Sequence, residues 1–298
     1  MKRNAIVRII LWSIVLLVLL ALFFALLYVP GSFFLKRESK PEAAKIPVPV
    51  TEQHDNSQFH RNIVNVDPSQ IRDLEIEWAA GSIRILPKDI TEIRITDEGT
   101  NQSQKPMIWK VRDGKLSIQY AEHKKISLGI DTQWDEISKD LLIEVPKDWQ
   151  CDSMEVTAAA ASLEVKDLTI REMEFDGASG NCVFDNCTVE TLDLDTASGN
   201  VHFTGSLEQM DCDAASADIL LELSNNPRSL DMDTASGDLD VTLPADAGFT
   251  VTLDSLSGEF ESDFETTMRG GSYVAGNGRC RIDVDAMSGD VTIRKSIK

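Results

Sequence analysis

Hydrophobic and polar residues alternate in short runs that are broken by a small-residue turn, and this unit recurs along the chain. Clear copies begin at Met173 (MEFDGASGNCVF), Leu192 (LDLDTASGNVHF), Leu230 (LDMDTASGDLDV) and Ile282 (IDVDAMSGDVTI). Alternation with period two on both sides of a turn predicts two half-buried strands per unit. Glycine recurs too often for these units to form amphipathic helices of useful length.

The copies keep a fixed register. The last apolar residue before the turn lies seven positions before the first apolar residue after it, as Leu194 and Val201 illustrate. Spacings between equivalent turn positions from Ala161 to Gly258 are 19, 19, 18, 20 and 21 residues. One such coil cannot bury its apolar face alone, whereas coils stacked at about 4.8 Å share a continuous core. The sequence therefore predicts an all-β fold, a parallel β-solenoid (β-helix) with coils of about 20 residues.

Small residues at the turn follow from the same stacking. A Ser-Gly corner can adopt positive φ, and it lets successive corners lie directly above one another. We therefore predict a structural turn role for Gly180, Gly199, Gly237, Gly258 and Gly289.

Residues 71–298 form the predicted solenoid domain, with irregular early coils over 71–150 and regular coils over 151–298. The strand-like segments of the early part are interrupted by Asp113–Gly114, a dipeptide typical of a hairpin turn. A surface loop is predicted from about residue 123 to 140.

The spacing of the turns lengthens before Gly289, where residues 269–278 read RGGSYVAGNG. This stretch lacks the lysine and threonine of a phosphate-binding loop, so we predict a loop that projects between coils. The charges of Arg294 and Lys295 are predicted to discourage end-to-end pairing of the last strand.

A long apolar run lies near the N-terminus. Residues 9–29 can cross a hydrocarbon core of about 30 Å as a helix. Bulky residues follow the run where a cleavage site needs small ones, so we predict an uncleaved transmembrane helix within residues 1–35, with a cleaved signal peptide as the alternative.

The proline-rich, charged residues 36–70 predict a flexible tether. Basic residues flank the run almost equally, so orientation rests on the very short N-terminal tail, which favours a single-pass cell-membrane protein with its C-terminal domain outside the cytoplasm.

Acidic residues are concentrated in the C-terminal half. The chain has a formal net charge of -20, and residues 150–298 hold 29 Asp and Glu against 9 Lys and Arg. Such a surface repels nucleic acid and anionic lipid, so no nucleic-acid partner is predicted.

Cysteine usage indicates neither a disulfide framework nor a zinc site, because five residues are an odd number and lack paired spacing. They are expected to be small buried hydrophobes. Cys280 is the one thiol with basic sequence neighbours, and a single Cys182–Cys187 bridge is left open. The cysteines are Cys151, Cys182, Cys187, Cys212 and Cys280.

Alignment of the copies places acidic residues at two outward positions before the turn, which predicts two columns of stacked carboxylates. Neighbours at about 4.8 Å repel by about 0.9 kcal/mol in bulk water. Either the carboxylates are solvated and splay apart, or divalent cations such as calcium bridge neighbouring coils. No cofactor is otherwise predicted. The candidate metal ligands are Asp176, Asp193, Asp195, Asp211, Asp213, Asp231, Asp233, Asp283 and Asp285.

Regularity argues against catalysis. A catalytic site needs unlike groups with separated pKa values, whereas these carboxylates recur in nearly every coil and His202 is a lone outward histidine. No catalytic or cofactor-binding residue is predicted, and a polysaccharide-acting β-helix enzyme is the least favoured reading. A binding surface should expose aromatic residues, and Trp78, Trp109, Trp134 and Trp149 place the expected partner region in the early coils.

The TASGN, TASGD, SLSGE and AMSGD corners, with LLIEVPKD at residues 141–148 ahead of them, resemble the bacterial "putative adhesin" family of β-strand-repeat proteins of unknown function. With the anchor, the arrangement is similar to the membrane-anchored member of Lia-type cell-envelope-stress operons. The resemblance implies a non-enzymatic scaffold or sensor module that faces envelope proteins or cell-wall glycan. An adhesin or glycan-binding module is the alternative.

Overall fold

The structure, a computed structural model, describes residues 61–99, 106–120 and 138–297. This part of the chain is all-β, as predicted, with one short 3-10 helix, η1 (Pro68–Gln70). The strands are β1 (Arg61–Val66), β2 (Asp73–Lys88), β3 (Ile93–Gly99), β4 (Ile108–Arg112), β5 (Lys115–Gln119), β6 (Lys139–Pro146), β7 (Gln150–Lys166), β8 (Thr169–Ser179), β9 (Cys182–Ser198), β10 (Val201–Ser216), β11 (Ile219–Leu223), β12 (Ser229–Ser236), β13 (Leu239–Leu243), β14 (Phe249–Ser257), β15 (Phe260–Ser262), β16 (Thr267–Arg269), β17 (Ser272–Ala275), β18 (Cys280–Ser288) and β19 (Val291–Lys295).

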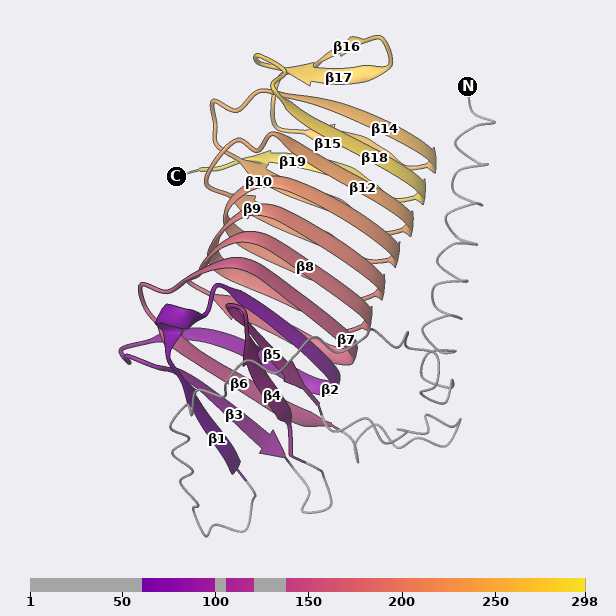
Figure 1. Cartoon of the computed structure of the whole chain (residues 1–298). Coiled ribbons are helices and arrows are strands. Elements are labelled where there is room, and N and C mark those ends of the chain that lie inside the picture. The colour runs from indigo at the N-terminus through magenta and orange to yellow at the C-terminus, as the bar shows by residue number, and fades with distance from the viewer. Residues whose placement is uncertain (1–60, 100–105, 121–137, 298) are drawn as a thin grey trace, which may run out of the picture.

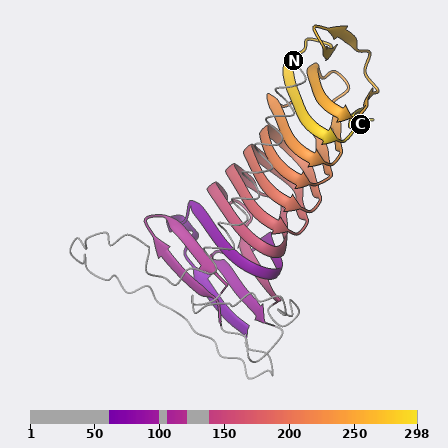
Figure 2. The ribbon, with the colours of Figure 1, turned by 90° about the vertical axis from the view of Figure 1, so that its right-hand side faces the viewer.

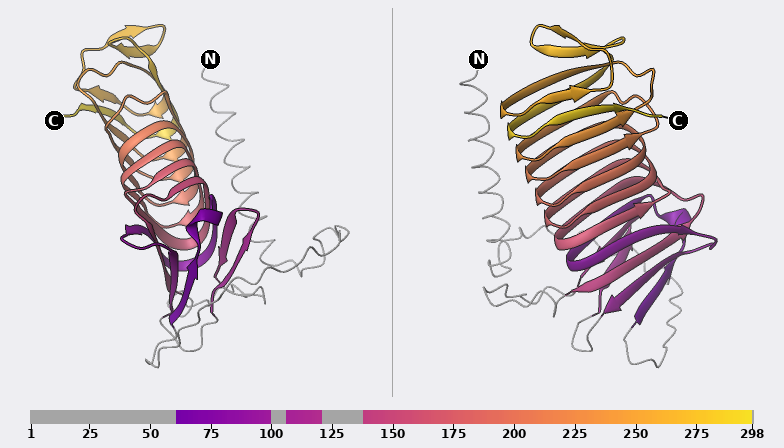
Figure 3. Two further views of the ribbon diagram at one scale, coloured as in Figure 1. Left: turned by 60° about the vertical axis from the view of Figure 1, so that its left-hand side comes forward. Right: turned by 180° about the vertical axis from the view of Figure 1, so that it is seen from behind.

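The strands wind into stacked coils, each of which runs along one sheet, turns at a small-residue corner and returns along a second sheet (Figure 1). We call the sheet before the corner face A and the sheet after it face B. Face A contains β5, β8, β12, β14 and β18. It also contains the parts of β2 and β7 before the corner and the C-terminal parts of β9 and β10, which lead up to the next corner. Neighbouring coils pair in parallel on both faces. Side views show an elongated stack that is widest at its N-terminal end (Figures 2 and 3).

Apolar residues from both faces meet inside the coils in columns. Leu194, Cys212 and Met232 stack in register on face A, and each is 0% exposed. On face B, Phe184 and Phe203 stack with ring centroids 5.8 Å apart. The alternation seen in the sequence thus becomes an inward row and an outward row on every strand.

The corners hold the coils in this register. Gly199 has φ +134°, and a Cβ on it would lie 2.1 Å from the carbonyl oxygen of Gly180 in the preceding coil. No side chain fits there, so the residue must be glycine. Gly180, Gly237 and Gly289 repeat this arrangement, which confirms the structural role predicted for them. Gly258 differs in lacking a positive φ, although a Cβ on it would still lie 2.1 Å from the oxygen of Gly289.

The Asn or Asp that follows each corner glycine binds the next coil. Asn181 Oδ1 accepts the backbone N–H of Asn200 at 3.0 Å, and Asp238 Oδ1 accepts that of Asp290 at 2.8 Å. Asn200, Asp218 and Asp290 make the same contact. We call these five residues the corner relay. The threonine before the corner adds a local bond, from Thr196 Oγ1 to the carbonyl oxygen of Ser198.

Coil order at the distal end of the stack departs from sequence order. Strands β18 and β19 lie between the coil of β12 and β13 and the coil of β14 and β15. The prediction that Arg294 and Lys295 protect a terminal strand is therefore wrong, because β19 is an interior strand. The coil of β14 and β15 suits the end position better, since its inward residues include Ser255 and Ser262, which tolerate water.

Residues 269–278 do not form the predicted irregular loop. They contribute to a hairpin of β16 and β17, whose turn residues Gly270 and Gly271 have φ +60° and +93°. Strand β17 pairs antiparallel with β14 and covers the distal end of the core. Tyr273 of β17 stacks on Phe260 with ring centroids 4.3 Å apart.

The N-terminal end closes with antiparallel strands. Strands β5 and β6 share one coil beside β2, and the predicted hairpin at Asp113–Gly114 joins β4 to β5. Strand β3 pairs with β6, and β1 pairs with β3. Strand β1 thus lies within residues 36–70, the predicted tether, and Asp140 belongs to β6 and not to a loop.

The predicted transmembrane helix at residues 9–29 lies outside the described residues, as does most of the predicted loop at 123–140. Within the described ranges, no helix has the length and apolar character needed to cross a bilayer.

Substitution of a corner glycine tests the stacking constraint. Gly199→Ala should lower the free energy of unfolding by at least about 2 kcal/mol, because either the coil spacing or the positive φ must change. Thermal unfolding followed by circular dichroism measures the effect, with the exposed neighbour Ser198→Ala as control, expected to change stability by less than about 0.5 kcal/mol. Equal stability of the two variants would contradict the constraint.

Candidate functional site

Two columns of carboxylates run along the outward side of face A. Asp193, Asp211, Asp231 and Asp283 stack in register in the first column, and Glu75, Glu155 and Glu174 continue it toward the N-terminal end. The second column contains Asp176, Asp195, Asp213, Asp233, Asp285 and, at the distal end, Asp254. The structure therefore brings together all nine aspartates that the sequence aligned. We call these residues the carboxylate columns.

The carboxyl groups of the columns have raised pKa values. Partial burial, followed by repulsion from the neighbouring carboxylates, raises the pKa of Asp176 and that of Asp213 from 3.8 to about 6. Burial followed by repulsion from neighbours also raises the pKa of Glu174, Asp195 and Asp211. Like charges at strand spacing disfavour each other's ionised form, as expected for stacked acids.

Basic side chains neutralise the columns toward their ends. Lys115 Nζ lies 3.8 Å from Glu75 and 3.4 Å from Glu155, so it joins carboxylates of adjacent coils. Arg281 does the same between Asp231, at 3.7 Å, and Asp283, at 3.3 Å. Among the described residues, no lysine or arginine forms such a pair with Asp176, Asp195 or Asp213. The middle of face A therefore carries the strongest uncompensated negative charge.

Face A has no evident cavity for a metal ion. In the described ranges, no group of three or more His, Cys, Asp or Glu side chains is arranged to hold one. The outward carboxylates point from strands, where backbone carbonyl oxygens are engaged in pairing between coils and contribute no further ligands. Calcium bridging stays a prediction to be tested.

The sequence from residue 71 to 294 matches the family described as Toastrack DUF4097. The chain belongs to this family. The match spans all the regular coils of the Toastrack domain and most of its N-terminal strands. No curated protein sequence matches the chain.

Solved structures with a similar fold include a "putative adhesin" from Bacteroides fragilis NCTC 9343, with 12% identity, a TM-score of 0.46, and coverage of 81% of this chain and 98% of that one. A "putative cell adhesion protein" from Clostridium sporogenes ATCC 15579 has 12% identity and a TM-score of 0.38 over 80% of this chain and 100% of its own. A "putative lipid binding protein" from Parabacteroides distasonis ATCC 8503 has the same identity and TM-score over 81% and 98%.

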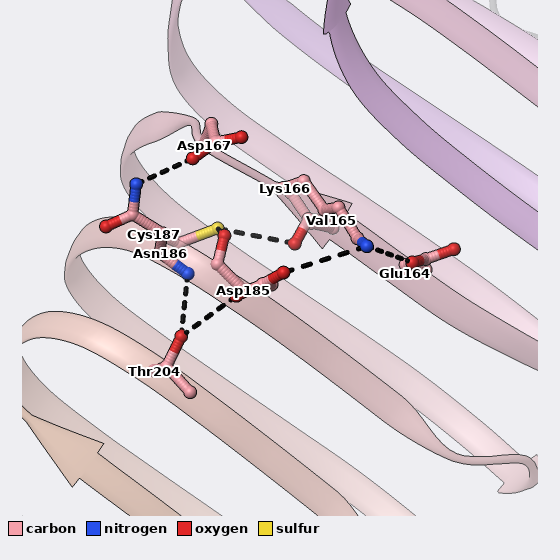
Figure 4. Close-up of polar contacts among 8 residues, drawn as sticks. All are labelled: Glu164, Val165, Lys166, Asp167, Asp185, Asn186, Cys187 and Thr204. Atoms are coloured by element: carbon pink, nitrogen blue, oxygen red, sulfur yellow. Dashed lines mark hydrogen bonds and ion pairs between the residues drawn. The ribbon is translucent and has the colours of Figure 1, made fainter.

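A second polar cluster lies at the return corner of the Toastrack domain, where face B leads back to face A (Figure 4). Lys166 Nζ lies 2.9 Å from Glu164 and 3.6 Å from Asp185, and the bond to Glu164 raises the pKa of Lys166. Asn186 donates to Asp167 at 2.6 Å and to the Thr204 hydroxyl at 2.7 Å. Except for the Lys166–Glu164 pair, which lies within β7, these contacts join neighbouring coils, so the cluster braces the return corner.

The remaining candidate nucleophiles and bases of the Toastrack domain lie apart from the columns. All five cysteines are buried and free, so the open Cys182–Cys187 bridge is absent. Burial raises the pKa of Cys280 to about 12 in spite of its arginine sequence neighbours, and the five thiols are the small buried hydrophobes that the sequence predicted. His202 lies on face B with Nε2 3.6 Å from Glu222 Oε1.

The tryptophans do not form the exposed partner surface that the sequence suggested. Trp78 and Trp149 are 3% and 9% exposed, and their indole N–H groups donate to the carbonyl oxygens of Lys139 and Ile71. Trp109 is half-buried against the core, and Trp134 lies outside the described residues. These side chains close the N-terminal end of the core.

Trp78 also covers a buried ion pair that the sequence gave no sign of. Lys139 is 1% exposed, and its Nζ lies 3.0 Å from Asp97, 2.6 Å from the carbonyl oxygen of Tyr120 and 4.2 Å from the centre of the Tyr120 ring. Burial outweighs the attraction of Asp97 and lowers the pKa of Lys139. Asp97 also accepts the backbone N–H of Met107 at 2.8 Å. The pair thus ties β3, β5 and β6 to the start of the segment that leads into β4.

The raised pKa values predict a stability that depends on pH. An acid whose pKa rises on folding binds protons more tightly in the folded state, so stability falls as pH rises from about 4 to about 6. Asp213→Asn should therefore stabilise the protein at pH 7.5 by about 1 kcal/mol, less than the full shift implies because solvent screens these carboxylates. The gain should vanish near pH 4, where the native carboxyl is already protonated.

Urea unfolding of parent and variant at pH 4.5, 6 and 7.5 measures this dependence. Glu265→Gln, an exposed acid in the loop after β15, serves as the matched control and should show no such trend. A gain that is the same at all three pH values would contradict the electrostatic explanation.

Calcium bridging has a separate test. If the carboxylates are simply solvated, millimolar calcium should leave the melting temperatures of the parent, Asp195→Asn and Asp233→Asn equally unchanged. Differential scanning calorimetry with and without the ion gives the answer. A rise in the parent that both variants lose would establish bridging cations instead.

Proposed function

We propose that this protein is a non-enzymatic scaffold or sensor module, anchored in the cell membrane through residues 9–29, that presents face A outside the cytoplasm to envelope partners. The observation that carries the proposal is the pair of carboxylate columns, which run without a break from Glu75 to Asp283 in the first column and from Asp176 to Asp254 in the second. Such a face attracts cationic protein surfaces and repels anionic ones.

Rigidity supports a presenting role. Each coil is bonded to its neighbours through both faces and through the corner relay, so charges on face A keep fixed spacings that a flexible acidic tail would lack. A partner with basic groups at matching intervals binds more tightly to such a preorganised surface, because face A loses little conformational entropy on binding. Lys115 and Arg281 illustrate the mode of contact, since each reaches carboxylates of two adjacent coils.

The alternative, an adhesin or glycan-binding module, receives less support. Neutral glycans bind to exposed aromatic rings, whereas Trp78 and Trp149 are buried. Catalysis on polysaccharide receives least support, because similar acids recur on face A in nearly every coil and, among the described residues, the lone outward histidine His202 lies on face B. Participation in a Lia-type response to envelope stress is the cellular setting that we propose for the scaffold.

Cross-linking in intact cells tests the proposal. The full-length protein with a lysine-reactive and carboxylate-reactive cross-linker should capture basic envelope proteins. The triple variant Asp176→Asn, Asp195→Asn and Asp213→Asn should lose most of the capture, roughly tenfold, because the uncompensated middle of face A is neutralised.

The matched control removes the same number of charges from face B, through Glu164→Gln, Glu222→Gln and Glu261→Gln. Capture should survive in this control. Equal loss in both variants would show that net charge alone matters, and cross-links exclusively between copies of this chain would replace partner binding by self-assembly.

A further inference from the structure

The sheet of face A has an open edge at each end of the stack. In the described ranges, β4 pairs with β5 and with no other strand. At the distal end, β17 covers β14 over residues 249–251, and no described strand pairs with the outer edge of residues 253–257. Unpaired edges of this kind accept further strands.

The two edges lie far apart within one molecule. The ladder from β4 to β14 passes through β5, β2, β7, β8, β9, β10, β12 and β18, which separates them by about 40 Å at strand spacing (Figure 1). A contact between these edges therefore requires two molecules.

The N-terminal edge carries basic and apolar side chains. Lys110 of β4 lies opposite Ser117, whose hydroxyl bonds to Glu75, so the row of Lys110 faces outward on face A. Lys110 is exposed, and Ile108 in the same row is 37% exposed. The alternate residues Trp109 and Val111 point inward and pack, partly buried, against the core.

The distal edge carries the complementary set. Asp254, the last member of the second carboxylate column, is exposed, and Leu256 beside it is 61% exposed. The inward residue Leu253 is only partly buried against the core. Ser255, also inward, has a buried hydroxyl with no hydrogen-bond partner in the described ranges. The core is therefore incompletely covered at this edge.

The edges match in one register. Strand β4 is antiparallel to β5, and the strands from β5 to β14 are parallel, so β4 of a following copy runs antiparallel to β14. Ile108 then lies opposite Leu256, and Lys110 lies opposite Asp254. On the inward side, Val111 lies opposite Leu253.

The last inward pair in this register brings the indole N–H of Trp109 to the hydroxyl of Ser255, which has no described partner. Each opposed pair is thus of a kind that stabilises neighbouring strands, whether apolar, oppositely charged or hydrogen-bonding.

We infer that copies of this chain join head to tail, with β4 of one copy paired antiparallel to residues 253–256 of the next. The occupant of each distal edge is a second copy of the chain. A contact between two different surfaces repeats from copy to copy without closing, so it forms a row of stacks. The inference does not rest on the proposed function, because face A of every copy stays exposed.

Paired cysteines test the contact. The full-length chain with Ile108→Cys and Leu256→Cys, oxidised in membranes, should give a ladder of dimers, trimers and larger species on a non-reducing gel. Directly opposed residues of neighbouring strands are close enough for a disulfide, whereas the two positions in one molecule are not. The five native cysteines are buried. Absence of the ladder would overturn the inference.

Two controls separate this contact from others. Ile63, on β1 at the same end, is also 37% exposed, and the chain with Ile63→Cys and Leu256→Cys should give roughly tenfold less linked product. Equal yields would indicate random collision and overturn the inference. The chain with Leu256→Cys alone should remain monomeric, and a strong dimer would show instead that two distal ends meet.

Charge reversal tests the register. In the chain with both cysteines, Asp254→Lys opposes two lysines and Lys110→Asp opposes two aspartates, so each variant alone should lose the ladder roughly tenfold. Co-expression of the two variants restores an opposite pair at every junction, and the ladder should return. Both residues are exposed. A full ladder from either variant alone, or none from the mixture, would contradict the pairing of Lys110 with Asp254.

Discussion

The fold depends on how closely the backbones of successive corners approach. At each glycine corner, a carbonyl oxygen of the neighbouring coil occupies the place where a Cβ would lie, about 2.1 Å away at Gly199. Coils can therefore stack at strand spacing only if the corner residue is glycine, or alanine where the backbone takes another path. Once the corners coincide, the register of both faces is fixed, and with it the inward columns of the core and the outward columns of charge.

The acidic surface is a direct product of this register. A repeat that places an aspartate outward in one coil places the next aspartate beside it, and burial together with this repulsion raises the pKa of Asp176 and Asp213. Serine or threonine would stack at the same positions without repulsion, as Thr157 and Thr252 do. A chain that keeps carboxylates at so many of these positions is less stable at neutral pH than it need be, which favours a role for the charge itself.

Sequence alone was enough for the coil, the corner and the alignment of the acids, because each follows from alternation and spacing. It was not enough for the order of the coils. The strands that begin VTLDSLSGEF and IDVDAMSGDV satisfy the same pattern, so alternation and spacing do not decide which of these two coils lies at the end of the stack. The Asp97–Lys139 pair was invisible for another reason: its members are 42 positions apart and belong to no repeat. The prediction of exposed tryptophans was wrong because a large ring can also fill the end of a core, as Trp78 and Trp149 do.

The corner relay bears on how such a protein changes during evolution. Asn200, Asp218, Asp238 and Asp290 each provide a side-chain acceptor to the coil on one side and receive one at the backbone N–H from the coil on the other, so their coils present the same pair of complementary ends. Duplication or deletion of about 20 codons would add or remove one coil and rejoin the relay without a mismatch. The length of the stack then changes in steps of about 4.8 Å, while the antiparallel strands at its two ends stay unchanged.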